Sequence, residues 1–408
     1  MDRTVVVALE TNTEQVAILQ RTLVENTECF NAVAKVGFAA KCSNGVTLHK
    51  QTYYPLRSQF PALPSQLVCA SRVKATEAVK SALTWQKKHA ARHAKLVKRA
   101  ESRGWVTPAF KPVKCPHSKL APVRYDARSF WVKWEGLTCS LATVEGRLKM
   151  KFVVPQHAQQ YVGGKICSAD LCFRKGRYYL HIVVSLEAPV VAKSLQVTGV
   201  DLGLNHPAVT SEALFLGQRR WKAQEQRLFR LRRQLQKSGS KSAKRHLKKI
   251  SGQLLRQRKD HDHVLSRRIV EGVEKGSTVV LENLTDIRDR VVLRKSEANR
   301  RLHSWSFSQL RQFVEYKAEA LGITVAFVDP RHTSQTCSRC QHQARNNRRS
   351  QSLFWCRQCG FRCNADLNAA RNIKEKHLAS LASLGISLAG GLPVKQPIVP
   401  FVGTSPRL

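Results

Sequence analysis

Four cysteines in the C-terminal third of the chain have the spacing of a metal site. They form two Cys-x-x-Cys pairs, Cys337 with Cys340 and Cys356 with Cys359, and fifteen residues separate the pairs. Four thiolates at this spacing can close tetrahedrally around one zinc ion, which leaves no coordination position open for a substrate. The alternative, four buried thiols without a metal, leaves the repeated spacing unexplained. We therefore predict a structural zinc ion, with Cys363 as a spare thiol.

Three carboxylates stand where the sequence pattern predicts the end of a strand or the start of a helix. Asp201 interrupts an apolar strand, Glu282 ends another, and Asp366 opens a helix. A buried carboxylate is costly unless it is paired or metal-bound, so an arginine partner is the alternative for any one of them. Taken together, they can hold two Mg²⁺ or Mn²⁺ ions ~3.5–4 Å apart, the arrangement that hydrolyses phosphodiesters. The three acids therefore predict a metal-dependent nuclease with a ribonuclease H-like arrangement.

The net charge indicates the class of partner. The chain has 408 residues and carries 69 Lys and Arg against 28 Asp and Glu, a formal net charge of +41. That much like charge disfavours a compact state until a polyanion neutralises it, so nucleic acid is the leading partner and an anionic membrane surface the lesser one. With 42% hydrophobic residues, the chain can bury sizeable cores, which excludes wholesale disorder. Its length predicts two or three domains.

The excess charge is concentrated in residues 219–268, which hold 18 Lys and Arg and three acids. An apolar stripe at helical spacing runs through this segment and is broken at Ser238-Gly239-Ser240, which predicts an antiparallel helical hairpin. A solvated helix face is the alternative interpretation of such a run. Because the segment offers few acids to pair with its cations, we favour contact with phosphates.

Hydrophobic periodicity divides the rest of the chain. Residues 4–9 alternate as a strand, residues 11–40 have helical spacing, and another helix begins near residue 64. Residues 53–64 contain three prolines and are predicted to form a loop. Period-two alternation from about residue 122 to residue 190 predicts a small β-domain, whose sheet we expect the first strand to join. Further strands are predicted at 197–204, 277–282 and 323–328, with a helix from Ser306 before the last.

The three acids and the first cysteine pair lie within four longer motifs, in this order: Gly199-Val200-Asp201-Leu202-Gly203, Leu281-Glu282-Asn283-Leu284, the segment from Pro330 to Cys340, and the segment from Asn364 to Ile373. The combination resembles transposon-encoded TnpB. It equally resembles the descendants of TnpB, the miniature type V CRISPR effectors, which share a RuvC nuclease domain with an inserted zinc ribbon. The match covers roughly residues 197–376.

The resemblance implies that Asp201, Glu282 and Asp366 are the three catalytic acids of a RuvC site and bind Mg²⁺ or Mn²⁺. Many relatives carry a further Asp two residues before the third acid, where this chain has Asn364. Only Asp366 is therefore carried over from that motif.

The resemblance also implies a multidomain α+β fold. A wedge-like β-barrel with an inserted helical recognition lobe precedes a ribonuclease H-like RuvC α/β domain with an inserted four-cysteine zinc ribbon. The predicted boundaries are 1–10 and 120–194 for the wedge-like β-domain, 11–119 for the recognition lobe, 195–336 and 360–380 for the RuvC domain, 337–359 for the zinc ribbon and 381–408 for a mobile tail.

The function implied by the resemblance is that of an RNA-guided DNA endonuclease. The protein would bind a structured guide RNA, recognise a short motif flanking the target DNA, and cut both strands in succession at one RuvC site after guide pairing. The alternatives are a nuclease-inactive RNA-guided repressor and a DNA transposase that acts without a guide. The short chain favours a transposon-encoded nuclease over a CRISPR effector. We expect a monomer without a membrane partner.

The first residues lack the layout of a signal peptide, and no apolar run reaches the ~18 residues of a membrane span. We therefore expect a cytoplasmic, nucleoid-associated protein of a prokaryote. The sequence assigns no individual nucleic-acid contact. His261 and His263 flank Asp262 on a helix, and because side chains two residues apart diverge, we expect neither to have a direct chemical role. Within the ribbon, several residues fit either nucleic-acid contact or local packing: Arg345, Arg348, Arg349, Phe354 and Trp355.

Overall fold

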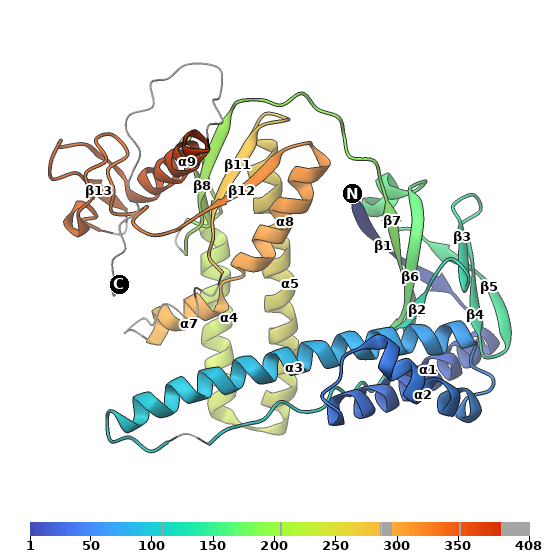
Figure 1. Cartoon of the computed structure of the whole chain (residues 1–408). Coiled ribbons are helices and arrows are strands. Elements are labelled where there is room, and N and C mark those ends of the chain that lie inside the picture. The colour runs from blue at the N-terminus through green and yellow to red at the C-terminus, as the bar shows by residue number, and fades with distance from the viewer. Residues whose placement is uncertain (108, 205, 286, 288–295, 351, 385–408) are drawn as a thin grey trace. The chain divides into compact units, whose positions relative to one another are not determined.

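The computed structural model describes residues 1–107, 109–204, 206–285, 287, 296–350 and 352–384. The chain divides into two compact units, Met1–Glu187 and Ala188–Leu408, and each is considered by itself (Figure 1). Most of the tail predicted at 381–408 lies outside the described residues. No helix in the described ranges combines the length and the apolar character needed to cross a bilayer.

The first unit is built on one antiparallel sheet with the strand order β2-β6-β7-β1-β5-β4-β3. Its strands are β1 (Asp2–Glu10), β2 (Val123–Tyr125), β3 (Phe130–Lys133), β4 (Thr138–Thr143), β5 (Gly146–Val153), β6 (Lys165–Arg174) and β7 (Arg177–Ser185), with a 3₁₀ turn, η1, at Gln156–Tyr161. Because β2 and β3 remain at its edges, the sheet is a nearly closed barrel.

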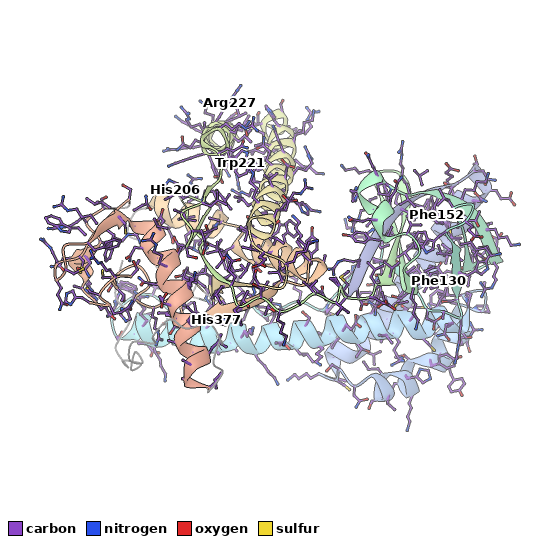
Figure 2. The ribbon with its side chains drawn as sticks, turned by 90° about the horizontal axis from the view of Figure 1, so that it is seen from above. Phe130, Phe152, His206, Trp221, Arg227 and His377 are labelled. Atoms are coloured by element: carbon purple, nitrogen blue, oxygen red, sulfur yellow. The ribbon has the colours of Figure 1, made fainter. Side chains whose placement is uncertain are left out.

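The first strand of the chain lies inside this sheet, although it is far in the sequence from the strands beside it. β1 lies between β5 and β7, where Val5 pairs with Ile182 and Leu9 pairs with Phe152. Alternate side chains of β1 and β7 point into the core, among them Val5 and Ile182, and Phe130 and Phe152 lie within the same sheet (Figure 2). The prediction that the opening strand joins the later sheet is confirmed.

Three helices stand between β1 and β2 in the sequence: α1 (Thr13–Ala39), α2 (Gly45–Gln59) and α3 (Ser65–Glu101). The loop predicted at 53–64 is wrong for its first half, because α2 continues through Pro55. Burial of one helix face outweighs the backbone hydrogen bond that the proline removes. That buried face consists of Leu48, Thr52 and Leu56.

The second unit contains a five-stranded sheet with the order β10-β9-β8-β11-β12. Its strands are β8 (Val197–Asp201), β9 (Ala208–Thr210), β10 (Phe215–Leu216), β11 (Thr278–Glu282) and β12 (Thr324–Val328). β11 pairs in parallel with both β8 and β12, whereas β9 runs antiparallel to β8. The carboxyl ends of β8, β11 and β12 therefore meet at one edge of the sheet.

The helices of this unit are α4 (Arg219–Ser238), α5 (Lys241–Glu271), α7 (Ser296–Ser304), α8 (Phe307–Ala320) and α9 (Ala365–Ser383). α4 and α5 form the predicted hairpin. Gly239 ends α4 with a positive φ of 64°, which suits glycine, and the Ser240 hydroxyl caps α5 by accepting from the amide of Ala243.

Helices cover both faces of the parallel strands. On β11, Val279 and Leu281 pack in one core with residues of α5 and α8, whereas Val280 packs in another with Ile373 of α9. Because successive strand residues point to opposite faces, the sheet lies between α5 and α8 on one side and α9 on the other (Figure 1).

Gly199 allows α9 to lie directly on the sheet. A Cβ atom at this position would stand 2.2 Å from the carbonyl oxygen of Ala370 and 2.7 Å from the amide nitrogen of Lys374. Both atoms belong to helix backbone, so they cannot move aside unless the helix moves. The glycine two residues before Asp201 therefore sets the approach of α9, whose first turn carries Asp366.

Replacing Gly199 by Ala is expected to lower the stability of the protein by roughly 1–3 kcal/mol, because it forces the helix from the strand. Gly252, inside α5, is the matched control: a Cβ atom there meets only the end of the Arg256 side chain at 3.4 Å. Ala at that position should stabilise by about 0.5–1 kcal/mol, as it does in other helix interiors. Thermal unfolding of both variants measures the difference, and an unchanged melting temperature for Gly199→Ala would contradict the close approach.

Candidate metal centres

Asp201 and Glu282 lie side by side because their strands are parallel. β8 and β11 pair Val200 with Leu281, so the next residue on each strand is one of the two acids. Val200 and Leu281 belong to the core shared with α5 and α8. Since side chains alternate along a strand, the two carboxylates point toward the other face, where α9 lies.

Asp366 comes to the same place from α9. It lies in the first turn of the helix and is 4% exposed. The Asn364 side chain caps this helix, because its Oδ1 accepts from the backbone N–H groups of Asp366 at 2.9 Å and Leu367 at 3.3 Å. The position at which many relatives have a further acid thus holds a capping side chain in this chain.

Burial and mutual repulsion act on Asp201. Burial raises the pKa of Asp201 well above its ordinary value, the carboxylates of Glu282 and Asp366 raise it further, and the Arg348 guanidinium opposes them. Each of the other two acids is therefore close enough to repel Asp201. The structure brings the three acids of the sequence prediction together at one edge of the sheet.

Burial also raises the pKa of Glu282, to about 7. Three neighbours act against this rise: the Thr333 hydroxyl, which donates to Oε1 of Glu282 at 2.7 Å, the ammonium group of Lys376 on α9, and the Arg348 guanidinium. Asp329 adds to the rise. The carboxylate pair on the strands thus sits in a buried environment that disfavours negative charge unless cations are near.

Two basic side chains contact Asp366. Nδ1 of His206 lies 2.8 Å from Oδ2 of Asp366, and the Arg348 guanidinium donates to Oδ1 at 3.3 Å. Arg348 comes from the ribbon, and His206 from the loop after β8. His206 is not predicted from the sequence, because no motif or spacing indicates it. For Arg348 the sequence predicts either a nucleic-acid contact or local packing.

Among the residues that the structure describes, the three acids do not form a compact single-ion group. In the described part of the chain, only the four-cysteine group brings at least three such ligand atoms within 4.8 Å of one another. A two-ion site does not require that all three carboxylates touch one point, because one bridging carboxylate and two flanking ones suffice. Oxygen ligands of this kind suit Mg²⁺ and Mn²⁺.

Asparagines of α9 join the acids to the ribbon. The side-chain amide of Asn372 donates to the carbonyl oxygens of Thr333 and Thr336, each at 2.7 Å, and that of Asn368 also donates to Thr336, at 2.8 Å. Oδ1 of Asn368 accepts from the amide of Ser338 at 3.0 Å. One helix therefore carries an acid and also holds the segment that positions Glu282 and enters the first cysteine pair.

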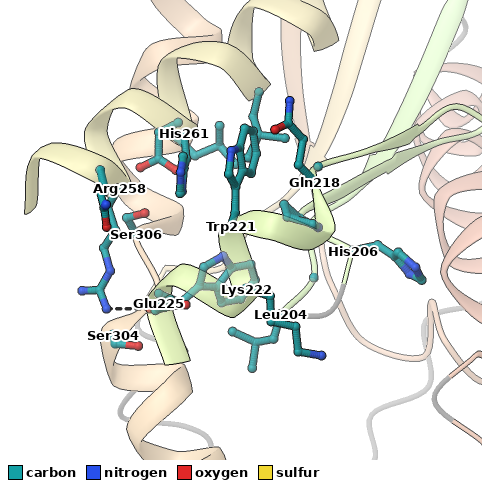
Figure 3. Close-up of a pocket in the computed structure, with 18 of the residues that line it drawn as sticks. Leu204, His206, Gln218, Trp221, Lys222, Glu225, Arg258, His261, Ser304 and Ser306 are labelled. Atoms are coloured by element: carbon teal, nitrogen blue, oxygen red, sulfur yellow. Dashed lines mark hydrogen bonds and ion pairs between the residues drawn. The ribbon is translucent and has the colours of Figure 1, made fainter. Parts of the chain in front are cut away.

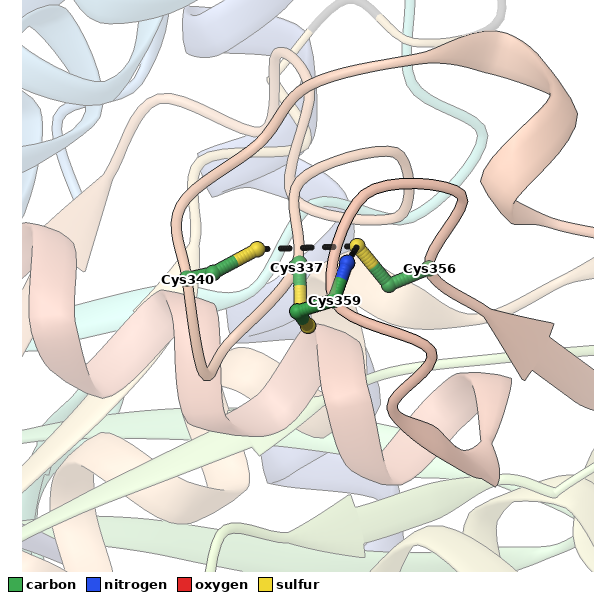
Figure 4. Close-up of side chains that lie close together, drawn as sticks. All are labelled: Cys337, Cys340, Cys356 and Cys359. Atoms are coloured by element: carbon green, nitrogen blue, oxygen red, sulfur yellow. Dashed lines mark hydrogen bonds between the residues drawn. The ribbon is translucent and has the colours of Figure 1, made fainter.

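The four predicted cysteines meet in the ribbon (Figure 4). Sγ of Cys337 lies 3.8 Å from Sγ of Cys359, and Sγ of Cys340 lies 3.5 Å from Sγ of Cys356. A tetrahedron with Zn–S bonds of ~2.3 Å has edges of ~3.8 Å, so the quartet matches a zinc site in donor type, number and separation. The cluster can bind zinc.

The ribbon extends further than predicted. A 3₁₀ turn, η2 (Arg345–Asn347), precedes a hairpin of β13 (Leu353–Trp355) and β14 (Arg362–Asn364). This hairpin continues past the predicted end at residue 359 and leads directly into α9. Cys363 pairs with Phe354 in the hairpin and lies outside the quartet, as a spare thiol should.

Two family models match parts of the chain. The model described as "Probable transposase" matches residues 181–288, which include Asp201 and Glu282. The model described as "Cas12f1-like, TNB domain" matches residues 307–373, which include the cysteine quartet and Asp366. The two matches divide the candidate site between them.

Curated relatives match between about a third and about half of this chain. The CRISPR-associated endodeoxyribonuclease Cas12f1 of Sulfoacidibacillus thermotolerans is 33% identical over 219 residues, which cover 49% of this chain and 50% of that protein. InsQ of Escherichia coli (strain K12) is 30% identical over 241 residues, covering 54% and 59%. A TnpB-like protein of Methanocaldococcus jannaschii is 33% identical over 131 residues, covering 32% and 46%. The chain thus spans about half the length of these relatives.

Solved structures share the fold. The Cas12f1-sgRNA-target DNA complex matches with a TM-score of 0.55 and 17% identity, over 88% of this chain and 83% of that one. CasPhi-2 (Cas12j) bound to crRNA matches with a TM-score of 0.51 and 9% identity, over 97% and 99%. At such identities the likeness shows the fold alone, which is the mixed helix and sheet architecture of Cas12 effectors.

Replacing Cys337 by Ser is expected to remove bound zinc, because three thiolates cannot close the tetrahedral site. Cys363→Ser is the matched control, since it removes a ribbon thiol outside the quartet. Elemental analysis of the purified proteins should find about one zinc ion per chain in the wild type and the control, and almost none in Cys337→Ser. Equal zinc content in the two variants would exclude the quartet as the site.

When a chelator removes divalent ions, the stability of the folded protein should depend on pH through Glu282. Its pKa is about 7 in the folded protein against an ordinary 4.5, so the folded state keeps a proton that the unfolded state has released. Stability is therefore lost as pH rises from 4.5 to about 7. Glu282→Gln cannot ionise and should be the more stable protein above that range, by up to roughly 3 kcal/mol.

Thermal unfolding from about pH 5 to about pH 8 measures this difference, with Glu271→Gln, an exposed acid on α5, as the control. Added Mg²⁺ should stabilise the wild type more than Glu282→Gln. A stability difference that stays constant with pH would contradict the role of this carboxyl.

Proposed function

Because the chain belongs to the TnpB family, we propose that it is an RNA-guided DNA endonuclease. It recognises a short flanking DNA motif, pairs a bound guide RNA with target DNA, and hydrolyses phosphodiesters at a two-metal RuvC site. The relatives support this proposal through their names, since Cas12f1 of Sulfoacidibacillus thermotolerans is called an endodeoxyribonuclease and the matched Cas12f1 complex contains an sgRNA and target DNA.

The observation that carries the proposal is the meeting of Asp201, Glu282 and Asp366 at the carboxyl ends of β8 and β11 and the start of α9. Asp201 ends a buried strand, and two further acids from distant parts of the chain raise its pKa. Three carboxylates gathered at one edge of a sheet repel one another when ionised, and divalent cations relieve this repulsion. Such sites are a feature of metal-assisted chemistry.

The residues of the chain have separate roles in this proposal. Asp201, Glu282 and Asp366 would hold the divalent ions, which would supply Lewis-acid activation of water and charge stabilisation at the leaving 3′-oxygen. His206 and Arg348 orient the Asp366 carboxylate. The Thr333 hydroxyl orients Glu282 through its 2.7 Å hydrogen bond.

The charge of the second unit supports a polyanionic partner. α4 and α5 carry most of the basic cluster at 219–268, and Arg227 is exposed on α4 (Figure 2). Ion pairs within the hairpin join Arg258 to Glu225 and Arg267 to Glu271, so the few acids there leave most of the cations available for phosphates.

We propose the domain assignment on the same basis. The barrel of the first unit is the wedge-like domain, α1 to α3 are the recognition lobe, the five-stranded sheet with its helices is the RuvC domain, and the four-cysteine segment is a zinc ribbon. The boundaries follow those of the sequence analysis, except that the ribbon hairpin extends to Asn364.

Replacing Asp201 by Ala should abolish Mg²⁺-dependent cleavage of a guide-matched target, by a factor of ~10³ or more, and should leave guide RNA binding intact. Asp260→Ala, which removes an exposed acid of α5, is the matched control. The protein is purified with its flanking genomic DNA co-expressed, bound RNA is sequenced, and cleavage is followed on denaturing gels.

Each alternative has its own outcome in this experiment. Specific DNA binding without RNA would favour a transposase. Bound RNA with target binding and no cleavage by the wild type would favour a repressor. Equal cleavage by Asp201→Ala and the wild type would remove Asp201 from the mechanism.

A further inference from the structure

A cavity of about 490 Å³ lies in the second unit beside the candidate metal site (Figure 3). The N-terminal half of α4, the middle of α5, the junction of α7 and α8, and the loop after β8 form its walls. One of its lining residues is His206, whose ring contacts the Asp366 carboxylate at 2.8 Å. The cavity therefore begins next to the position where a scissile phosphate would meet the acids.

Aromatic rings form much of the lining. The Trp221 indole is stacked on the His261 imidazole with ring centroids 4.1 Å apart, which fixes its orientation. Phe229 and Trp305 add two more rings. His261, for which no direct chemical role is predicted, supports Trp221 through this stacking. Walls of this kind favour a flat ring as the occupant.

A buried carboxyl lines the same cavity. Asp262 is 6% exposed, and both Asp262 and Ser306 line the cavity. Its Oδ2 atom has no hydrogen-bond partner among the residues that the structure describes. A buried acceptor without a donor is unfavourable, so a ligand that donates an N–H group would satisfy it.

Positive charge stands around this acceptor. The guanidinium of Arg258 pairs with Glu225 at 2.7 Å, and that of Arg300 lies 3.8 Å from the centroid of the Phe229 ring. Both residues line the cavity together with Lys222. Stacking surfaces, a buried acceptor and flanking cations are the combination by which proteins bind single bases of a polyanionic strand.

We propose that this cavity holds one unstacked nucleobase of the DNA strand being cleaved, at a nucleotide next to the scissile phosphate. The inference rests on the proposed nuclease function and adds a base-binding subsite to it. Extruding the base turns the backbone at that point and exposes its phosphate to the acids. Because Asp262 offers an acceptor, the subsite prefers bases with an exocyclic amino group, which are adenine, cytosine and guanine, over thymine.

The first experiment compares Trp221→Ala with Phe313→Ala in the complete complex with guide RNA and target DNA. The pair is matched, because Phe313 is also a half-buried ring stacked on a histidine of α5, His263, at 4.0 Å, and it does not line the cavity. Cleavage is measured on intact DNA and on targets with one abasic nucleotide at successive positions around the cut.

The wild type should cleave on the order of tenfold more slowly when the abasic nucleotide occupies one particular position, because stacking is lost there. Trp221→Ala should show a similar loss on intact DNA and no further loss at that abasic position. Phe313→Ala should behave as the wild type. The subsite would be overturned if the losses caused by Trp221→Ala and by the abasic nucleotide multiplied independently. Equal cleavage rates for Trp221→Ala and Phe313→Ala would also overturn it.

A binding measurement that requires no cleavage accompanies this test. In the Asp201→Ala background, 2-aminopurine, a fluorescent base with an amino group, is placed at each position of a single-stranded DNA oligonucleotide. Its fluorescence should be quenched at one position and recover when Trp221 is also replaced. Unchanged fluorescence at every position would overturn the subsite. If the wild type cuts no target, the proposed function fails, and this measurement still decides whether the cavity binds a base.

Asp262→Asn tests the preference for an amino group. It also keeps the proposal testable if Trp221→Ala fails to fold. The amide keeps the size of the side chain and replaces one of its two acceptor oxygens with a donor group, so the fold should remain, as circular dichroism will show. The wild type should favour adenine, cytosine or guanine over thymine at the identified position by on the order of tenfold, and the variant should lose most of this preference. An unchanged preference would remove Asp262 from the subsite.

Discussion

The repulsion among three carboxylates gathered at one edge of a sheet is the constraint that organises the second unit. Asp201, Glu282 and Asp366 come from two strands and a helix, and burial together with neighbouring carboxylates raises the pKa of the two strand acids. Apolar packing cannot relieve such repulsion, whereas cations can. Arg348 supplies one positive charge from the ribbon and Lys376 another from α9. The proposed metal ions complete this balance, which explains why a site for cations forms where the strands end.

The ribbon acts on the acids through short, defined contacts. Asn368 and Asn372 of α9 hold the backbone between Thr333 and Ser338, and the first cysteine pair follows immediately. From that same segment the Thr333 hydroxyl reaches Glu282, and from the segment between the two cysteine pairs Arg348 reaches Asp366. A zinc ion bound by the quartet would therefore act beyond the cysteines, because it would hold both ends of the loop that carries Arg348 and the cysteine pair next to Thr333.

The loop after β8 connects the acids to the cavity. Its His206 contacts Asp366 on one side and lines the cavity on the other. The basic hairpin of α4 and α5 provides the remaining walls, so the elements with the strongest positive charge also carry Trp221, His261 and Asp262. A strand attracted by the hairpin would meet both an aromatic surface and the acids, which is a physical reason for their adjacency.

Local patterns in the sequence determined the elements and the candidate ligands. The break at Ser238-Gly239-Ser240, the apolar strands that end in Asp201 and Glu282, and the cysteine spacing each depend on near neighbours in the chain, so periodicity and spacing sufficed to find them. The family resemblance added that the distant acids belong to one site. The sequence did not predict that α2 continues through Pro55 or that the hairpin of β13 and β14 extends as far as it does. Burial of a helix face and strand pairing outweigh the local preferences of these residues. Only the tertiary structure decided that His206 and Arg348 contact Asp366 and that a cavity opens beside them. Those contacts depend on how the packed helices and strands position charged side chains that are far apart in the sequence. Local spacing in the sequence does not determine the distances between such side chains.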